Sequence, residues 1–199
     1  HRNDPENVLK TYAMLDNQSN SCFIKDELAD QLHAKKTATD LQITTMLKKE
    51  TVSSYMIEDL IVRGINEDMK IEMPPTYTRP SIPASRELIP RPETARRLKH
   101  LKNVADTETA RRLKHLKNVA DNLPEYDETL NVGLLIGFNC KRALVPKATV
   151  VGGDDEPYGL KTNLGWCVAG FMGDAESEDS RIDDQNITPT FEDEMMDIG

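Results

Sequence analysis

Short runs of β-branched and aromatic residues, separated by polar turns, constrain the fold of this chain more than any other feature. Such runs occupy residues 8–15, 21–24, 41–47, 53–65, 131–138, 148–151 and 158–170. Runs of this length and pattern are typical of strands. Residues 25–34 differ, because Leu28 and Leu32 stand four apart and predict a short helix. The sequence therefore predicts a mainly β fold, small and mostly antiparallel, with accessory helices.

Four segments refine this prediction. The runs at 41–47 and 53–65 are separated by a polar stretch, which predicts a hairpin or a meander. Residues 71–92 contain six of the eleven prolines. Proline lacks the backbone donor that a helix or an internal strand requires, so we expect an extended segment that is neither. Further on, residues 131–144 predict a buried strand followed by a short helix, and 158–170 one or two closing strands around Trp166.

A tandem duplication follows the proline-rich segment. The sequence ETARRLKHLKNVAD occurs at 93–106 and again, unchanged, at 108–121. Within one copy Leu98, Leu101 and Ala105 share a helical face, which predicts a helical insertion. The basic residues of both copies could contact nucleic acid. Acidic residues dilute them and no aromatic residue interleaves, so a solvated helix face is favoured over a nucleic-acid site.

The net charge of −9 is concentrated at one end of the chain. Residues 174–199 hold ten acids and one base, so this segment alone carries 1 − 10 = −9. A segment so acidic and so poor in aromatic residues cannot bury enough apolar surface to fold. We predict that residues 172–199 form a disordered acidic linker.

Several functional classes have little support in the sequence. Cys22, Cys140 and Cys167 are far apart and lack metal-ligand spacing, so we expect reduced thiols, a cytoplasmic location, no metal and no cofactor. No apolar run reaches the roughly 18 residues of a membrane span. There is no glycine-rich phosphate loop.

Asp16 is the residue with the clearest catalytic context. It follows the apolar run YAML and precedes the polar turn NQS. An aspartic protease holds each catalytic carboxylate on a tight loop after a strand, and two such carboxylates share one proton. A half-size chain would supply one loop and obtain the second from a dimer mate. The stretch GLLIG at 133–137 has the form of a strand that passes behind such a loop. An Asp at the end of a strand is more often a simple turn residue, and a strand such as GLLIG is more often plain core. The two in this order within one small β domain are a more specific sign of an aspartic protease.

Four blocks of sequence resemble a known family. They are YAMLDNQSNSCFI, YTRPSIPASRELIPRPETARRLKHL, VGLLIGFNC with the AL and P that follow, and PYGLKTNLGWCVAG. In this order they resemble the retropepsin-like aspartic protease region of Bel/Pao-type LTR retrotransposon polyproteins. The resemblance runs from about Asn7 to Gly170.

The resemblance implies a retropepsin-like lobe, a small closed antiparallel β barrel, formed by 1–85 and 130–171 and interrupted by an insertion at 86–129. It implies that Asp16 is catalytic, with Asn17, Gln18 and Ser19 in its loop and Ser19 hydrogen-bonded to its carboxylate. Leu135, Ile136 and Gly137 would support that loop, and the hairpin around Lys48–Ser53 would form a flap over substrate. The implied partners are a second copy of the chain, a polyprotein peptide and a downstream reverse transcriptase. An N-terminal strand that usually precedes the Asp strand would be missing.

The catalytic triplet departs from the family pattern. Asp16-Asn17-Gln18 stands where these proteases generally have Asp-Thr/Ser-Gly. The hydroxyl at the second position normally locks the two loops of the dimer, and the third position normally turns tightly on glycine. Two interpretations therefore remain: an active homodimeric endopeptidase, or an inactive remnant that binds peptides or serves a structural role.

Overall fold

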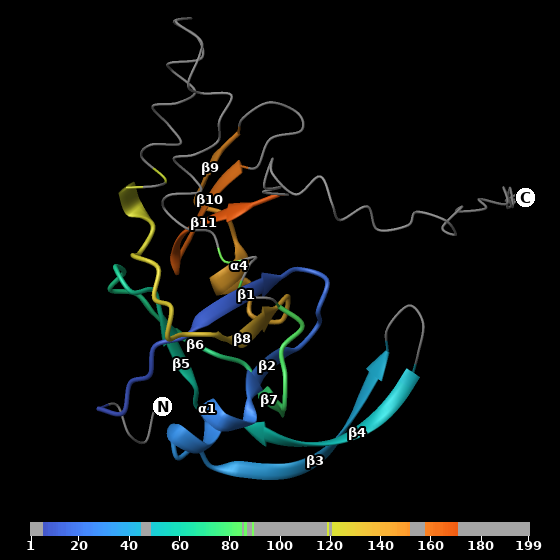
Figure 1. Ribbon diagram of the computed structural model, residues 1–199. Helices are drawn as coiled ribbons and strands as arrows, with labels where there is room; N and C mark the ends of the chain where they lie inside the picture. Colours follow the sequence, from blue (N-terminus) through green and yellow to red (C-terminus); the bar gives the residue numbers. More distant parts are fainter. Residues whose placement is uncertain are drawn as a thin grey trace, which may run out of the picture.

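The computed structural model describes residues 6–44, 49–84, 86, 89, 119, 121–151 and 158–170. Its main body is a six-stranded sheet in the order β1-β8-β2-β7-β4-β3 (Figure 1). The strands are β1 (Tyr12–Asp16), β2 (Cys22–Lys25), β3 (Lys36–Thr44), β4 (Lys49–Ile57), β7 (Thr76–Arg79) and β8 (Val132–Gly137). The prediction of a mainly β fold is confirmed.

The six-stranded sheet is mixed and does not close. β1 pairs with β8 in parallel, and so does β2 with β7. The other three pairings, β2 with β8, β4 with β7 and β3 with β4, are antiparallel. Within the described residues β1 and β3 are the two edges and do not meet. The expected closed antiparallel barrel is therefore wrong, because β8 returns from late in the chain and inserts between β1 and β2.

Two smaller sheets accompany the main one. β9 (Ala148–Val150), β10 (Tyr158–Thr162) and β11 (Gly165–Ala169) form an antiparallel sheet in the order β11-β10-β9 (Figure 1). Residues 158–170 thus provide two strands joined by a tight turn, where Gly165 has a φ of +108° that favours glycine. β5 (Ile61–Arg63) pairs with β6 (Lys70–Glu72), so the predicted run at 53–65 is divided between β4 and β5.

Both short helices match their predicted positions. α1 (Asp26–Gln31) begins with Asp26 and Glu27, which complement the positive end of the helix dipole. It ends where His33 adopts a left-handed φ of +50°, with Ala34 N–H donating to Ala29 O over 3.1 Å and His33 N–H to Asp30 O over 2.9 Å. This is the Schellman pattern of helix termination. α4 (Lys141–Leu144) is a single turn after β8.

The proline-rich segment contains an internal strand, contrary to the prediction. β7 lies between β2 and β4 in the sheet, although Pro74 and Pro75 precede it and Pro80 follows it. The four residues of β7 itself, Thr76–Arg79, contain no proline and keep every backbone donor. Thr76 and Thr78 are buried, and Thr76 is fully so. The prolines therefore set the ends of the strand rather than exclude it.

The core lies on both sides of β8, whose six residues are all buried. One cluster includes Cys22, Ile57, Ile71, Leu134 and Ile136. A second cluster on the other face joins Ile82, Ile89, Val132 and Leu135. A strand covered on both faces is apolar throughout instead of alternating, which explains the sequence VGLLIG.

Two predicted regions fall largely or wholly outside the described residues. Apart from Val119 and Asp121, the duplicated 15-residue copies lie there, and so does the acidic segment 172–199.

Candidate active site

Asp16 is the last residue of β1 and its carboxylate accepts hydrogen bonds from its own loop. Asp16 Oδ1 accepts the backbone N–H of Gln18 at 2.9 Å and that of Ser19 at 3.3 Å. This is the local turn that an aspartate at a strand end favours. The side chains of Asn17 and Gln18 are exposed, whereas Asp16 is half-buried. The carboxylate is therefore held in place while remaining partly open to solvent.

The loop after Asp16 rests directly on the end of β8. Asp16 lies opposite Gly137 in the parallel β1–β8 pairing. Phe138 N–H donates to Ser19 O at 2.6 Å, and a Cβ added to Gly137 would lie 2.2 Å from Ser21 O. No side chain fits between these backbones, so only glycine allows the contact. Leu135 and Ile136 are buried just before Gly137. Residues more than a hundred positions apart are thus brought together.

Ser19 contacts the carboxylate through its main chain rather than its hydroxyl. Its Oγ donates to Ser21 O at 2.8 Å, which tightens the loop above Gly137. Gln18, in the position that resembles the family glycine, is not among the described non-glycine residues with positive φ, which are His33 and Asp59. The turn therefore forms on a glutamine without a left-handed backbone at that position.

Cys22 and Cys140, which no local sequence pattern connects, lie in one buried cluster beneath this loop. Cys22 Sγ accepts the N–H of Gly137 at 3.3 Å and donates to Asn139 Oδ1 at 3.1 Å. All three cysteines are free. The separation of Cys22 and Cys140 in sequence, 118 positions, left no local signal of the cluster.

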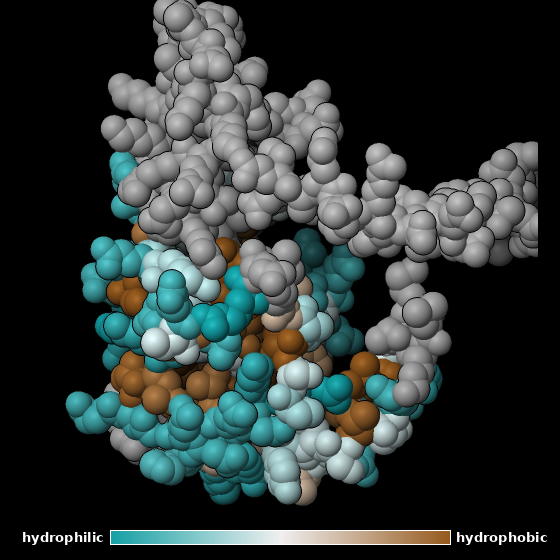
Figure 2. Space-filling view, viewed as in Figure 1, coloured by the Kyte–Doolittle hydropathy of each residue, from teal (hydrophilic) through white to brown (hydrophobic). Residues whose placement is uncertain are grey.

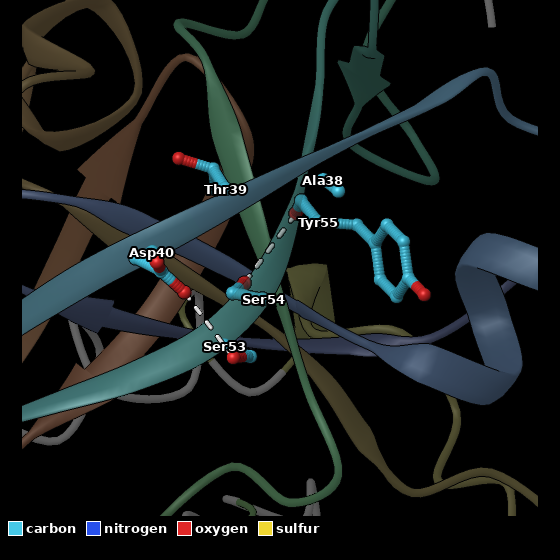
Figure 3. Close-up of a pocket in the computed structure, with 6 residues that line it drawn as sticks. All are labelled: Ala38, Thr39, Asp40, Ser53, Ser54 and Tyr55. Carbon is cyan, nitrogen blue, oxygen red and sulfur yellow. Dashed lines mark hydrogen bonds between the residues drawn. The ribbon is translucent and has the colours of Figure 1, made fainter.

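The β3–β4 hairpin, predicted as a flap, carries a shallow hollow of about 380 Å³ (Figure 3). Its lining comes from facing parts of the two strands, Ala38, Thr39 and Asp40 on β3 and Ser53, Ser54 and Tyr55 on β4. Ser53 Oγ donates to Asp40 Oδ1 at 3.2 Å across the hairpin. The hollow contains no residue of the Asp16 loop, so it is not the site predicted from the sequence. Residues 45–48, which include Lys48 of the predicted flap, lie outside the described residues.

The outer part of this hairpin projects from the sheet (Figure 1). β3 and β4 pair along their whole length, from Lys36↔Ile57 to Thr44↔Lys49. β4 pairs with β7 only through Met56 and Ile57. Apolar side chains nevertheless gather on the outer hairpin as well as on the body (Figure 2). An amphipathic ribbon held at one end is suited to cover a bound chain.

Among the described residues, no group of three or more His, Cys, Asp or Glu side chains could hold a metal ion. No helix there has the length and apolar character that crossing a membrane requires. The basic repeat residues proposed above for nucleic-acid contact lie outside the described part of the chain. Searches with the sequence and the structure find no matching family model, curated protein or solved structure.

Proposed function

We propose that this chain is an aspartic endopeptidase of the retropepsin-like type, related to Bel/Pao retrotransposon proteases, that acts as a homodimer. Asp16 of each subunit would supply one carboxylate of the catalytic pair. The observation that carries the proposal is the contact between the Asp16 loop and Gly137. It holds a half-buried carboxylate at the end of a strand, with the loop backbone packed against a completely buried neighbouring strand.

The requirement for a dimer follows from the chemistry. A single carboxylic acid with an ordinary pKa of about 3.9 is ionised at neutral pH and has no proton to donate. Two carboxylates held close together cannot both ionise, so the pair keeps one proton. The ionised member then activates water, and the protonated member donates to the substrate carbonyl. The hydrogen bonds to Asp16 in the described part of the chain come from its own loop, which leaves a second Asp16 to complete the pair.

The substrate class follows from the hairpin. A peptide in extended conformation would lie between the two Asp16 loops, with the outer β3–β4 hairpins of both subunits above it. The natural substrate would then be the polyprotein that contains this domain, including the junction with a downstream reverse transcriptase. β4 joins β7 near one end of the hairpin, through the pairing of Met56 and Ile57 and the Ser54 bond to Thr78 O. This supports the role, because the outer part of the hairpin can bend without disturbing the body.

The exposed edge of β3 favours a second candidate function. β3 is a nine-residue edge strand without proline, and an edge of this kind can accept a further strand from a peptide. An exposed Asn17, in place of a hydroxyl that would link two loops, fits a chain that binds peptides without cleaving them. In this case the fold would be a peptide-binding module descended from a protease.

The test is peptide cleavage by the purified chain at mildly acidic pH, with a fluorogenic library of extended peptides. We expect Asp16→Asn to lower cleavage about a thousandfold, since it removes the acid–base pair. Asp68→Asn, the same change at an exposed carboxylate outside the loop, is the matched control and should cleave normally. Activity per chain should rise with protein concentration, and excess Asp16→Asn chain should inhibit the wild type by forming mixed dimers.

A folded dimer that binds the peptides but cleaves none would reject the protease and support the peptide-binding module. Cleavage that survives Asp16→Asn would reject both the assignment of Asp16 and the proposed mechanism.

A further inference from the structure

The sulfur atoms beneath the Asp16 loop form a cluster that the proposed proteolytic chemistry does not use. Cys22 is fully buried and Cys140 is 4% exposed. Cys22 Sγ lies 3.1 Å from Oδ1 of Asn139, the residue before Cys140, and Cys140 Sγ lies 3.8 Å from Met73 Sδ. Two free thiols in one buried cluster, one of them against the turn that carries the other, are candidates for a disulfide. Cys167, on β11, takes no part in this cluster and its Sγ faces Leu160 O at 3.4 Å.

We propose that Cys22 and Cys140 are a modification site for hydroperoxides, at which oxidation forms a reversible disulfide that rearranges the Asp16 loop. The pair joins the first residue of β2 to the turn between β8 and α4, so the bond would tie together the two segments on which the loop rests. Formation of the Cys22–Cys140 disulfide can be measured whether or not the chain cleaves peptides.

The two thiols have different roles in this reaction. The Cys22 hydrogen bond, together with the Ala143 N–H and the Arg142 charge, lowers the pKa of Cys140 to about 7. The contact with Cys140 and burial raise the pKa of Cys22. Of the two thiols, Cys140 is therefore the one that more readily gives the thiolate, which is the form that peroxide oxidises. Cys22 keeps its proton and acts as the resolving thiol.

The reaction balances in two steps. The Cys140 thiolate attacks one oxygen of hydrogen peroxide, which breaks the O–O bond, gives Cys140 sulfenic acid and releases hydroxide. The Cys22 sulfur then attacks the Cys140 sulfur, and the sulfenic oxygen leaves as water with the Cys22 proton. The released hydroxide takes up a proton from solvent. Overall, two thiols and one hydrogen peroxide give one disulfide and two waters, with both sulfurs oxidised and both peroxide oxygens reduced.

Cys140 is buried, so peroxide would have to enter through the surface turn that carries it. Phe138 and Asn139 before it, and Lys141 and Arg142 after it, are all exposed. The turn is closed by two short-range bonds, Cys140 N–H to Gly137 O at 2.9 Å and Ala143 N–H to Cys140 O at 3.0 Å. Under the proposal, breaking these two bonds would open the turn and expose the thiol.

Disulfide formation would change the position of the Asp16 loop, because Cys22 contacts the residues on which the loop rests. The thiol proton that Cys22 donates to Asn139 is lost, and Cys22 Sγ moves toward Cys140 and away from the Gly137 N–H. Gly137 and Ser21 are in backbone contact, so a shift of either moves the loop that holds the carboxylate. Oxidation of Cys22 and Cys140 would therefore move the Asp16 loop.

The experiment treats the full-length chain with hydrogen peroxide, blocks remaining thiols, and maps the products by mass spectrometry. We expect a Cys22–Cys140 cross-link within one chain, a loss of about 2 Da and reversal by dithiothreitol. Hydrogen exchange of the backbone amides at 17–22 and 137–138 should change about threefold or more on oxidation and return on reduction. Cys167→Ser is the matched control and should cross-link like the wild type.

The variants assign the order of attack. Cys22→Ser should accumulate sulfenic acid on Cys140, detectable with dimedone, whereas Cys140→Ser should leave Cys22 largely unreacted. If a variant folds poorly, the mass-spectrometry map of cross-links in the wild-type chain still tests the proposal. Cross-links that involve Cys167 or join two chains, with Cys22 and Cys140 still reduced, would overturn the proposal. So would a Cys22–Cys140 bond that leaves hydrogen exchange of the Asp16 loop unchanged.

Discussion

Strand β8 and the outer β3–β4 hairpin use similar aliphatic residues in opposite ways. All six residues of β8 are buried, and neighbours pair with the strand on both sides. In the hairpin, partly buried residues such as Leu41, Ile43 and Val52 alternate with exposed ones, and β3 is a sheet edge. An isoleucine in β8 holds the Asp16 loop in place, whereas a valine in the hairpin stabilises mainly the ribbon itself. Position in the sheet, more than residue type, determines what each side chain contributes.

The largest difference should come from cavities. Ile136 is fully buried beside the loop contact, so we expect Ile136→Ala to lower the free energy of unfolding by about 4 kcal/mol. Val52 is only half-buried, and Val52→Ala should cost less than about 1 kcal/mol. Urea unfolding followed by circular dichroism measures both. Equal losses at the two positions would show that the hairpin is as integral to the core as β8.

A smaller effect is expected where β8 meets the loop. In Gly137→Ala the new methyl group would lie 2.2 Å from Ser21 O, a backbone atom that cannot rotate away, and we expect a loss of about 3 kcal/mol. Gly133→Ala is the control in the same strand. Its methyl group would lie 2.0 Å from Leu28 Cδ1 and 2.6 Å from Thr11 Oγ1. Both are side-chain atoms rather than backbone, so the loss should be about 1 kcal/mol less. Equal or reversed losses in the same unfolding experiment would contradict the loop contact.

The smallest effect should come from the hairpin's exposed hydrogen bond. Ser53→Ala removes the bond to Asp40 at a solvated position and should change the free energy of unfolding by less than about 0.5 kcal/mol. Ser54, its neighbour, is buried and donates to Thr78 O at 2.9 Å. Ser54→Ala leaves that carbonyl without its partner and should cost about 1–2 kcal/mol. Two serines with indistinguishable effects would mean that the hairpin's two faces do not differ in burial.

Much of the local structure could be predicted from short patterns. The strand before Asp16, the strand at 22–25, helix α1 and the strand VGLLIG with its following turn of helix all lie where the residues place them. The β3–β4 hairpin also forms, but β4 begins at Lys49, within the polar stretch that was expected to separate the two strands. In each case the signal is the period of the apolar residues or a residue that ends an element. Such signals act over a few residues, so the chain itself contains them.

The pairings could not be predicted in the same way. The prolines around β7 predict that this segment stays out of the sheet interior, yet Thr76 and Thr78 are buried there. The expected closed antiparallel barrel is an open mixed sheet in the described residues, because β8 inserts beside β1 in parallel. Both errors concern which strand becomes whose neighbour, and local patterns carry no information on that choice.

The sequence by itself determined that Asp16 ends a strand, that its loop can form on polar residues, and that a glycine closes a buried strand far downstream. Only the tertiary structure decided that this glycine lies against Ser21 and that Cys22 and Cys140 lie in one buried cluster. The physical reason is that strand and turn preferences arise from neighbouring dihedral angles and side chains. Contacts across more than a hundred residues depend on how all the buried surfaces pack at once.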